Sequence, residues 1–194
     1  MKPTIVLAST SPFRRSILEK LQIPFICVSP NCDETSFDNE PAMDLVKRLA
    51  EKKARSCNDL PPNSLIIGSD QVCVINEKIV GKPHTKEKAI EQLSQASGQC
   101  VSFYTGLSLY NNTSNTAQTV CEVFKVHFRE LTPLQIENYI EKEQPLNCAG
   151  SFKSEGLGIA LFDRLEGKDP NTLIGLPLIS LIDMLETENY SILK

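Results

Sequence analysis

The chain has 194 residues, of which 41% are hydrophobic and 23% charged, and its formal net charge at pH 7 is −4. These values are typical of a folded globular protein and exclude extensive disorder. The negative charge gives no general attraction to nucleic acid or to anionic membrane surfaces. A nucleic-acid-binding module is therefore the least favoured function, and any phosphate binding must come from a local group of residues.

The seven cysteines are widely spaced and form no Cys-x-x-Cys pair, and only two histidines accompany them. A zinc site therefore has little support, and a free cysteine in an apolar stretch behaves as a small hydrophobic residue. The start of the chain shows no signal-peptide pattern. The apolar stretch 173–182 is interrupted by Gly175 and Pro177 and is too short to span a bilayer. We expect a protein of the reducing cytoplasm with no membrane partner.

The first half of the chain alternates apolar runs with amphipathic segments. The pattern predicts strands at 4–8, at 25–28 and from residue 65, and a short ribbon around Val80. Helices are predicted at 13–21, from Pro41 to about residue 57, and from Thr85 to about Gly98. This alternation indicates an α/β core whose consecutive strands are partly parallel.

The second half has longer strand candidates. Segments 100–110 and 119–129 flank the turn 111–115 and predict an antiparallel hairpin. A capping box begins at Thr132 and predicts a helix to about Lys142. Segment 147–162 has a strand-like, glycine-interrupted pattern, and the tail from residue 177 is predicted to be helical. We expect an α/β fold with a mixed twisted sheet flanked by helices, arranged as two lobes around a cleft.

The segment after the first predicted strand carries residues suited to phosphate. Ser11 is placed to cap a helix, and Pro12 occupies its first position, where a missing N–H costs nothing. Arg14 and Arg15 fall in the first turn, where positive charge meets the positive end of the helix dipole. This placement is unfavourable unless an anion lies nearby. Free backbone N–H groups at the helix start, hydroxyl groups and guanidinium groups together suit the binding of phosphate. A capped helix with two solvated arginines remains the alternative from these residues alone.

A lysine lies on the apolar face of the helix predicted after Pro41. At 100° per residue, Lys53 falls near the centre of this face, whereas Lys47 and Arg48 lie outside it. The face is formed by Ala42, Leu45, Val46, Leu49 and Ala50. A buried lysine is costly unless it is paired. The helix could fray there or the side chain could extend to solvent, but we favour a cleft in which Lys53 meets a phosphate or a carboxylate.

Acidic side chains occur in two separate loops. Asp70 ends the apolar run that starts at residue 65, a position at which open α/β sheets bind ligands. Asp33 and Glu34 lie in the loop after the second predicted strand. Acids from two loops can share Mg²⁺ or Mn²⁺, which prefers oxygen ligands and substrate phosphates. An ordinary turn or cap residue is the alternative for Asp70.

An ordered set of segments resembles the Maf family of nucleotide pyrophosphatases and covers nearly the whole chain. The matching segments are 7–15 (Leu-Ala-Ser-Thr-Ser-Pro-Phe-Arg-Arg), 33–35 (Asp-Glu-Thr), 67–72 (Ile-Gly-Ser-Asp-Gln-Val), 81–83 (Gly-Lys-Pro), 103–106 (Phe-Tyr-Thr-Gly), 151–156 (Ser-Phe-Lys-Ser-Glu-Gly), 169–173 (Asp-Pro-Asn-Thr-Leu) and 175–177 (Gly-Leu-Pro). The ordered set is far more specific than any one motif. The resemblance implies a single domain over 1–194, with a nucleotide in the cleft of a fold like that of the ITPases.

The activity implied by this resemblance is hydrolysis between the α- and β-phosphates of a nucleoside triphosphate, which removes modified nucleotides. Asp70 would accept the proton of the attacking water, and Glu34 with Asp70 would lie near a divalent cation, Mg²⁺, Mn²⁺ or Co²⁺. The triphosphate would be held by Ser9, Arg14, Arg15, Lys53 and Lys82. Charge neutralisation and positioning are what phosphoryl transfer needs most.

Three further positions carry the implied base specificity. Relatives acting on dTTP and UTP have arginine, threonine and glutamine where this chain has Phe13, Gln71 and Glu155. The chain is therefore similar to the subgroup that acts on 7-methyl-GTP, although a member of that subgroup carries tryptophan at the place of Phe13. Without the resemblance, Phe13 would be interpreted as core packing and Glu155 as a solvated loop acid.

Other functions stay open at this stage. A dTTP/UTP or broad modified-nucleotide pyrophosphatase would keep the chemistry and change the base. A non-catalytic regulator is a different class, since the family was first associated with inhibition of septum formation. The sequence is compatible with either a monomer or a homodimer.

Overall fold

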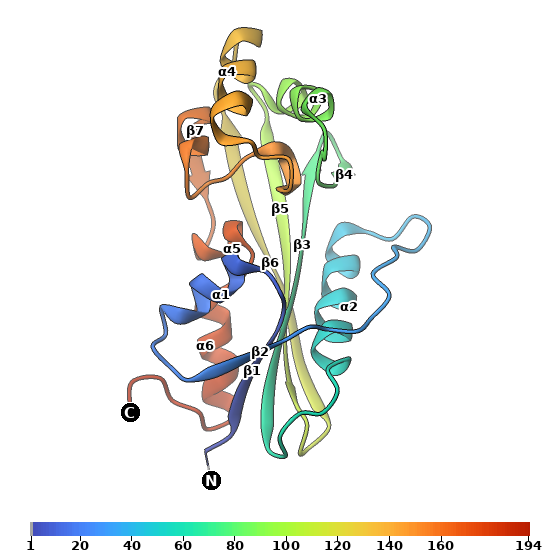
Figure 1. Cartoon of the computed structure of the whole chain (residues 1–194), viewed down its shortest axis with the longest axis vertical. Coiled ribbons are helices and arrows are strands. Elements are labelled where there is room, and N and C mark those ends of the chain that lie inside the picture. Colours follow the sequence, from blue (N-terminus) through green and yellow to red (C-terminus); the bar gives the residue numbers. More distant parts are fainter. Residues whose placement is uncertain (1) are drawn as a thin grey trace. The chain divides into compact units, whose positions relative to one another are not determined.

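The computed structural model describes residues 2–194, which adopt a mixed α/β fold. They contain a seven-stranded sheet in the order β2-β1-β3-β5-β6-β7, with β4 paired to β3 (Figure 1). The strands are β1 (Thr4–Ala8), β2 (Phe25–Val28), β3 (Ser64–Ile75), β4 (Lys78–Val80), β5 (Cys100–Asn111), β6 (Thr116–Phe128) and β7 (Phe162–Glu166). The helices are α1 (Pro12–Glu19), α2 (Ala42–Arg55), α3 (Lys86–Ala96), α4 (Pro133–Glu143), α5 (Asn171–Ile174) and α6 (Leu178–Thr187), with short 3₁₀ turns η1 (Ala149–Ser151) and η2 (Leu157–Leu161).

The sheet combines parallel and antiparallel pairing. β1 lies between β2 and β3 and is parallel to both, with Ile5 opposite Phe25 on one side and Leu65 on the other. β4 is antiparallel to β3, and β7 is antiparallel to β6. The predicted mixed α/β sheet with partly parallel consecutive strands is thereby confirmed.

The chain divides into two compact units. The first comprises the chain up to Gln71, Thr105–Glu122 and Lys168–Lys194. The second comprises Val72–Tyr104 and Val123–Gly167. Strands β3, β5 and β6 each contribute residues to both units.

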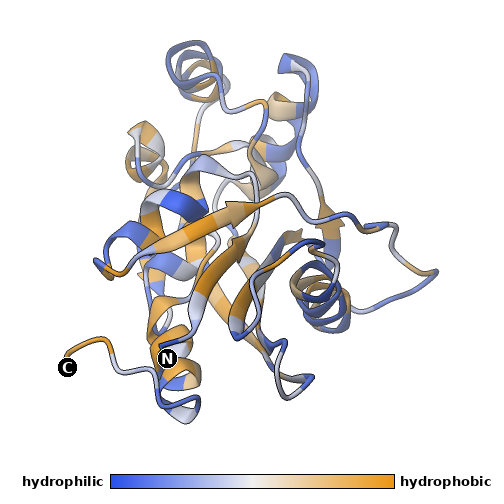
Figure 2. Cartoon of the chain, turned by 60° about the horizontal axis from the view of Figure 1, so that its bottom comes forward, coloured by the Kyte–Doolittle hydropathy of each residue, from blue (hydrophilic) through white to orange (hydrophobic). Residues whose placement is uncertain are grey.

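The first unit buries both faces of β1, which explains why its sequence is a continuous apolar run instead of an alternating one. Ile5 and Leu7 belong to a core cluster that also contains residues of α1 and α6. Val6 and Ala8 belong to a second cluster with Ala54 of α2. Figure 2 shows the hydrophobic residues concentrated in the strands, with hydrophilic residues frequent in loops and on exposed helix faces.

Helix α2 approaches the sheet closely because two strands carry glycine beneath it. A Cβ atom on Gly68 of β3, or on Gly106 of β5, would collide with the backbone of α2. The absence of these side chains lets the backbone of the helix pack directly on the strands. This close packing brings the last turn of α2, which carries Lys53, against the middle of β3.

Two predicted boundaries in the first unit were wrong. The strand that begins near residue 65 does not end at Asp70, because β3 continues to Ile75 and pairs there with β4. Asp70 therefore lies within a strand and not at its end. Helix α1 stops at Glu19 instead of residue 21, and the chain then turns at Gln22, which has a positive φ of 52°.

The strand predicted over 147–162 was also wrong, since this segment forms η1 and η2 and only Phe162 begins β7. Its glycines make turns, and Gly150 has a φ of +74°. The turn inserts Phe152 into an edge-to-face aromatic cluster with ring centroids 4.9–5.5 Å apart. The cluster consists of Phe103, Phe128, Phe152 and Phe162. Aromatic packing thus outweighs the strand-like pattern of the segment.

All seven cysteines are free thiols. Burial raises the pKa of Cys73 far above its usual value and raises that of Cys121 to about 11, so both thiols stay protonated at neutral pH. Among residues 2–194, no helix is long and apolar enough to cross a membrane.

Candidate active site

Lys53 is the centre of a charged group in the first unit. Its Nζ lies 2.7 Å from Asp70 Oδ1 and 2.7 Å from Glu34 Oε2. Lys53 is only 6% exposed, whereas the side chain of Glu34 is 54% exposed. Burying the ammonium is tolerated because two carboxylates face it. The position of Lys53 on the apolar face of α2 is explained by this pairing and not by fraying of the helix.

The loop that carries Glu34 is tied to the same helix. Lys52 Nζ donates to the backbone oxygen of Asp33 at 2.7 Å. The Asp33 carboxylate accepts hydrogen bonds from the N–H and the hydroxyl of Thr35, and these bonds lower its pKa. Asp33 therefore shapes the loop, and it is Glu34 that faces Lys53.

Arg14 lies near the two acids of this group. Its Nε donates to the carbonyl of Gly175 at 2.9 Å, and Ser69 Oγ donates to the same carbonyl at 2.8 Å. Burial lowers the pKa of the Arg14 guanidinium, while the negative charges of Asp70 and Glu34 raise it. A guanidinium remains charged at neutral pH even when it is shifted. The first unit therefore gathers two cations and two carboxylates.

The start of α1 is built as the sequence predicts. Ser11 Oγ accepts the N–H of Arg14 at 3.4 Å, and Pro12 is the first residue of the helix. Ser9 Oγ in turn accepts the N–H of Ser11 at 3.1 Å, which fixes the turn between β1 and α1. Phe13 is 40% exposed, so core packing does not account for its presence.

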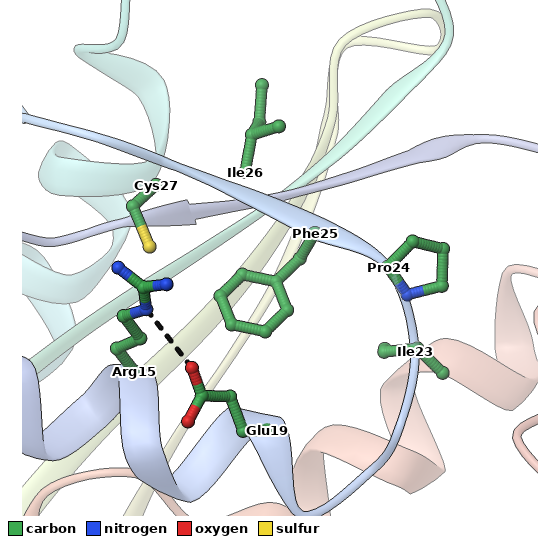
Figure 3. A pocket seen from close by; sticks show the side chains of 7 residues that line it. All are labelled: Arg15, Glu19, Ile23, Pro24, Phe25, Ile26 and Cys27. Atoms are coloured by element: carbon green, nitrogen blue, oxygen red, sulfur yellow. Dashed lines mark hydrogen bonds and ion pairs between the residues drawn. The ribbon is translucent and has the colours of Figure 1, made fainter.

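Arg15 is directed elsewhere. Figure 3 shows Arg15 paired with Glu19. The distance from Nε to Oε1 is 3.1 Å, and the side chain of Arg15 is 65% exposed. Both residues border an open pocket of about 530 Å³ along α1 and β2, lined also by Ile23, Pro24, Phe25, Ile26 and Cys27. Among the contacts of residues 2–194, none joins Arg15 to Lys53, Asp70 or Glu34.

Gln71 uses its amide nitrogen within the protein. Nε2 donates to Thr105 Oγ1 at 2.9 Å and to the carbonyls of Thr172 and Leu173 at 2.8 and 3.2 Å. These contacts commit both amide protons and anchor α5, which leaves the amide oxygen as the acceptor for other groups. Thr172 Oγ1 is the one buried side-chain polar atom without a hydrogen-bond partner in the described part of the chain.

Asp169, the first residue of the matching segment 169–173, is a buried acid for which the sequence predicted no role. It is 2% exposed, and its carboxylate accepts the N–H and the side-chain amide of Asn171, as well as the N–H of Ile179. It thus holds the starts of α5 and α6, on either side of Gly175. The signal was present, because an Asp-Pro-Asn sequence is typical of an Asx turn.

Two predicted site residues belong to the second unit. Lys82 and Glu155 are both exposed. Both charges shift the pKa of the Cys148 thiol. Burial raises this pKa most, the negative charge of Glu155 raises it further, and the positive charge of Lys82 lowers it. The two charges therefore lie in the neighbourhood of one side chain.

The acidic residues fit one kind of metal site. Glu34 Oε2 and Asp70 Oδ1 share a partner atom, and Mg²⁺ is commonly held by one or two carboxylates together with substrate phosphates. Within residues 2–194, no group of three or more His, Cys, Asp or Glu side chains is placed to hold a metal ion. The two carboxylates fit an ion that binds together with a nucleotide.

Comparison with known proteins decides the family. The family model described as Maf-like protein matches residues 4–188. The chain belongs to the Maf family. It is 65% identical over 193 residues to a protein of Aliivibrio fischeri named 7-methyl-GTP pyrophosphatase, and the match covers 100% of both chains. A protein of Vibrio vulnificus with the same name is 61% identical over 97% of both chains.

Solved structures with a similar fold are more distant in sequence. The Ham1 protein of Staphylococcus aureus matches with a TM-score of 0.54 and 15% identity, over 95% of this chain and 99% of that one. A HAM1 protein from Coxiella burnetii matches with a TM-score of 0.52 and 16% identity, over 96% and 99% of the two chains. The chain therefore shares the fold of the Ham1 proteins, and the predicted mixed α/β architecture is confirmed.

Proposed function

We propose that this Maf protein is a hydrolase that cleaves 7-methyl-GTP to 7-methyl-GMP and pyrophosphate. The observation that carries the chemistry is Lys53, buried between Asp70 and Glu34 and accompanied by Arg14. The substrate is supported by relatives of 59–65% identity that bear the name 7-methyl-GTP pyrophosphatase. The activity is assigned to one functional domain over residues 1–194, as a monomer or a homodimer in the cytoplasm.

The proposed reaction is attack of water on the α-phosphorus. The bond from this phosphorus to the bridging oxygen breaks, and pyrophosphate leaves. Lys53 contacts Asp70 Oδ1, so we assign the proton of the attacking water to the other oxygen, Oδ2. Arg14 and Lys53 neutralise the charge of the triphosphate, with Ser9 and Lys82 as further phosphate ligands. Arg15 would have to leave Glu19 to join them.

Asp70 and Glu34 are the residues that would hold a divalent cation. Mg²⁺, Mn²⁺ or Co²⁺ at this place would clamp phosphate oxygens and offset the charge that develops on the leaving group. The negative charge of the two carboxylates is already balanced in part by Lys53. The cation is therefore expected to bind with the triphosphate and weakly without it.

Base recognition is assigned to Phe13, Gln71 and Glu155. Methylation at N7 makes guanine cationic, and a cationic ring stacks well on an aromatic face such as the exposed ring of Phe13. Gln71 offers an acceptor oxygen, and Glu155 offers a carboxylate for the N1–H and the exocyclic amine. The negative charge of Glu155 also favours the methylated base directly.

Glu155→Gln is therefore expected to lower kcat/KM for 7-methyl-GTP by about tenfold or more, because it removes a charge-assisted hydrogen bond. Turnover of UTP should change much less, since uracil carries no positive charge. Steady-state pyrophosphate release from both substrates measures the two effects. Equal losses on both nucleotides would show that Glu155 does not recognise the base.

Gly175 has a φ of +116°, and its carbonyl accepts hydrogen bonds from Arg14 and Ser69. Gly175→Ala is expected to cost about 1–3 kcal/mol of stability because a side chain is strained at this φ. The new Cβ would also lie 3.4 Å from Arg14 Nε, so KM for the nucleotide should rise. Thermal unfolding and steady-state kinetics test this, with Gly81→Ala, which has open space, as the stability control. An unchanged melting temperature and KM would contradict it.

The first test of the function is a substrate panel. Pyrophosphate release is measured from 7-methyl-GTP, GTP, dTTP, UTP and CTP, each with Mg²⁺, Mn²⁺ or Co²⁺. Strong preference for 7-methyl-GTP is the expected result. Preference for pyrimidines would keep the enzyme and reject the base assignment, and no release from any nucleotide would favour the non-catalytic regulator.

A further inference from the structure

The loop that carries Glu155 is a tight turn within the second unit. The carbonyl of Lys153 accepts two backbone N–H groups, from Gly156 at 3.3 Å and from Gly158 at 3.1 Å. A Cβ on Gly158 would collide with this carbonyl, so the turn closes only with glycine there. Glu155 lies in the exposed part of the turn. The Ser154 hydroxyl donates to Glu155 Oε2 at 3.4 Å, so the orientation of this carboxylate depends on that contact and on what holds the turn.

The side chain of Glu143, the last residue of α4, holds this turn from both sides. Its Oε2 accepts the N–H of Leu157 at 2.9 Å, and its Oε1 lies 3.3 Å from Lys153 Nζ. The same lysine Nζ also donates to the Glu143 carbonyl at 2.7 Å. A Cβ on Gly156 would lie 2.9 Å from Glu143 Oε1, so the carboxylate packs directly against the residue that follows Glu155.

A second residue on the same face of α4 fixes the start of the turn. Tyr139 lies one helical turn before Glu143, and its hydroxyl accepts the N–H of Lys153 at 3.0 Å. Burial raises the pKa of Tyr139, so the hydroxyl remains neutral at working pH. Phe152, the residue before Lys153, is fixed in the aromatic cluster. Lys153 and Leu157 are thus both held by α4, and the side chains between them are those of Ser154 and Glu155, because residue 156 is glycine.

We propose that Glu143 is a positioning residue for base specificity, which holds the turn 153–158 so that Glu155 presents its carboxylate to the cationic base. The inference rests on the proposed function, in which Glu155 recognises 7-methylguanine. Glu143 contacts the turn and is assigned no contact with the nucleotide. Its charge pairs with Lys153, and its second oxygen orients the backbone at Leu157.

The consequence is a loss of discrimination without a matching loss of catalysis. Glu143→Ala removes the carboxylate from Lys153 Nζ and from the Leu157 N–H, while the bonds of Lys153 to the backbone carbonyl of residue 143 and to Tyr139 remain. The turn is then held at its start and released at Leu157, so Glu155 takes more orientations. The preference, defined as kcat/KM for 7-methyl-GTP divided by kcat/KM for UTP, is expected to fall about tenfold. Turnover of UTP, which needs no negative charge at the base, should stay within about twofold of wild type.

Glu143→Gln provides an intermediate variant that keeps the shape of the side chain. The amide oxygen can still accept the Leu157 N–H, but the ion pair with Lys153 is lost. Its preference is expected to lie between those of the wild type and Glu143→Ala. Glu141→Ala is the matched control, because Glu141 lies on the same helix and pairs instead with Lys86 at 2.9 Å.

The decisive experiment is a double-mutant cycle with Glu155→Gln, in which pyrophosphate release from 7-methyl-GTP and UTP is measured for each variant. If Glu143 acts through Glu155, then Glu143→Ala lowers the preference in the wild type and has no further effect in Glu155→Gln. An undiminished preference in Glu143→Ala, or the same loss in both backgrounds, overturns the inference. A wild-type protein without preference for 7-methyl-GTP overturns the proposed function, and this inference with it.

Discussion

Replacing Asp70 with asparagine is expected to lower kcat for pyrophosphate release from 7-methyl-GTP by roughly 10²–10⁴-fold, the usual contribution of a positioned general base. The amide keeps the shape of the carboxylate and a hydrogen-bond acceptor for Lys53, but it cannot take a proton from water. KM should change much less, because Arg14 and Lys53 remain in place. Steady-state kinetics under saturating divalent cation measure both parameters.

Asp44→Asn is a suitable control for this variant. Asp44 is an exposed residue in the first turn of α2, the helix that carries Lys53. Its replacement by asparagine removes one negative charge, as Asp70→Asn does. It should leave kcat unchanged. If Asp70→Asn were as active as this control, Asp70 would not be the general base. If Asp70→Asn lost turnover but kept its function in cells, a regulatory binding protein would be favoured.

The sequence predicted the first unit well where the pattern was local. The serine cap and the proline at the start of α1 depend on neighbouring residues, and they were found as predicted. The placement of Lys53 near the centre of an apolar face also followed from helical geometry alone. Its two partners did not, because Glu34 and Asp70 are far apart in sequence and meet only once α2 packs on Gly68.

The missed features are those set by long-range packing. The local pattern of 147–162 favours a strand, but the burial of Phe152 among three other phenylalanine rings requires a turn. Asp169 has the sequence of a simple turn residue, yet it also binds the N–H of Ile179, ten positions later. Gln71 was assigned to the substrate through resemblance, and only the fold shows that its nitrogen anchors α5.

Lys53→Met should lower kcat/KM for 7-methyl-GTP by about 10²-fold or more, because a preorganised positive charge facing the phosphates is lost. The same change should lower the melting temperature. It leaves the largely buried carboxylate of Asp70 near that of Glu34 without the ammonium that lies 2.7 Å from each. Removing one partner of a buried pair costs up to about 3–5 kcal/mol, and the exposure of Glu34 should keep the cost below this range. Lys47→Met, which removes a charge from the same helix outside its apolar face, is the matched control for both measurements.

The double variant Lys53→Met/Asp70→Asn separates the catalytic role of this pair from its role in the fold. Lys53 lies on the apolar face of α2, so a methionine there buries hydrophobic surface, and the asparagine removes the carboxylate that Lys53→Met alone would leave without its ammonium. Replacing a buried ion pair by neutral groups is often neutral or stabilising by about 1–4 kcal/mol. The double variant is therefore expected to melt at or above the wild-type temperature while releasing no measurable pyrophosphate. If it melted as low as Lys53→Met alone, the ion pair would be needed for folding. Recovery of stability without activity would mean that the pair is retained for catalysis, at a cost to stability that is typical of active sites.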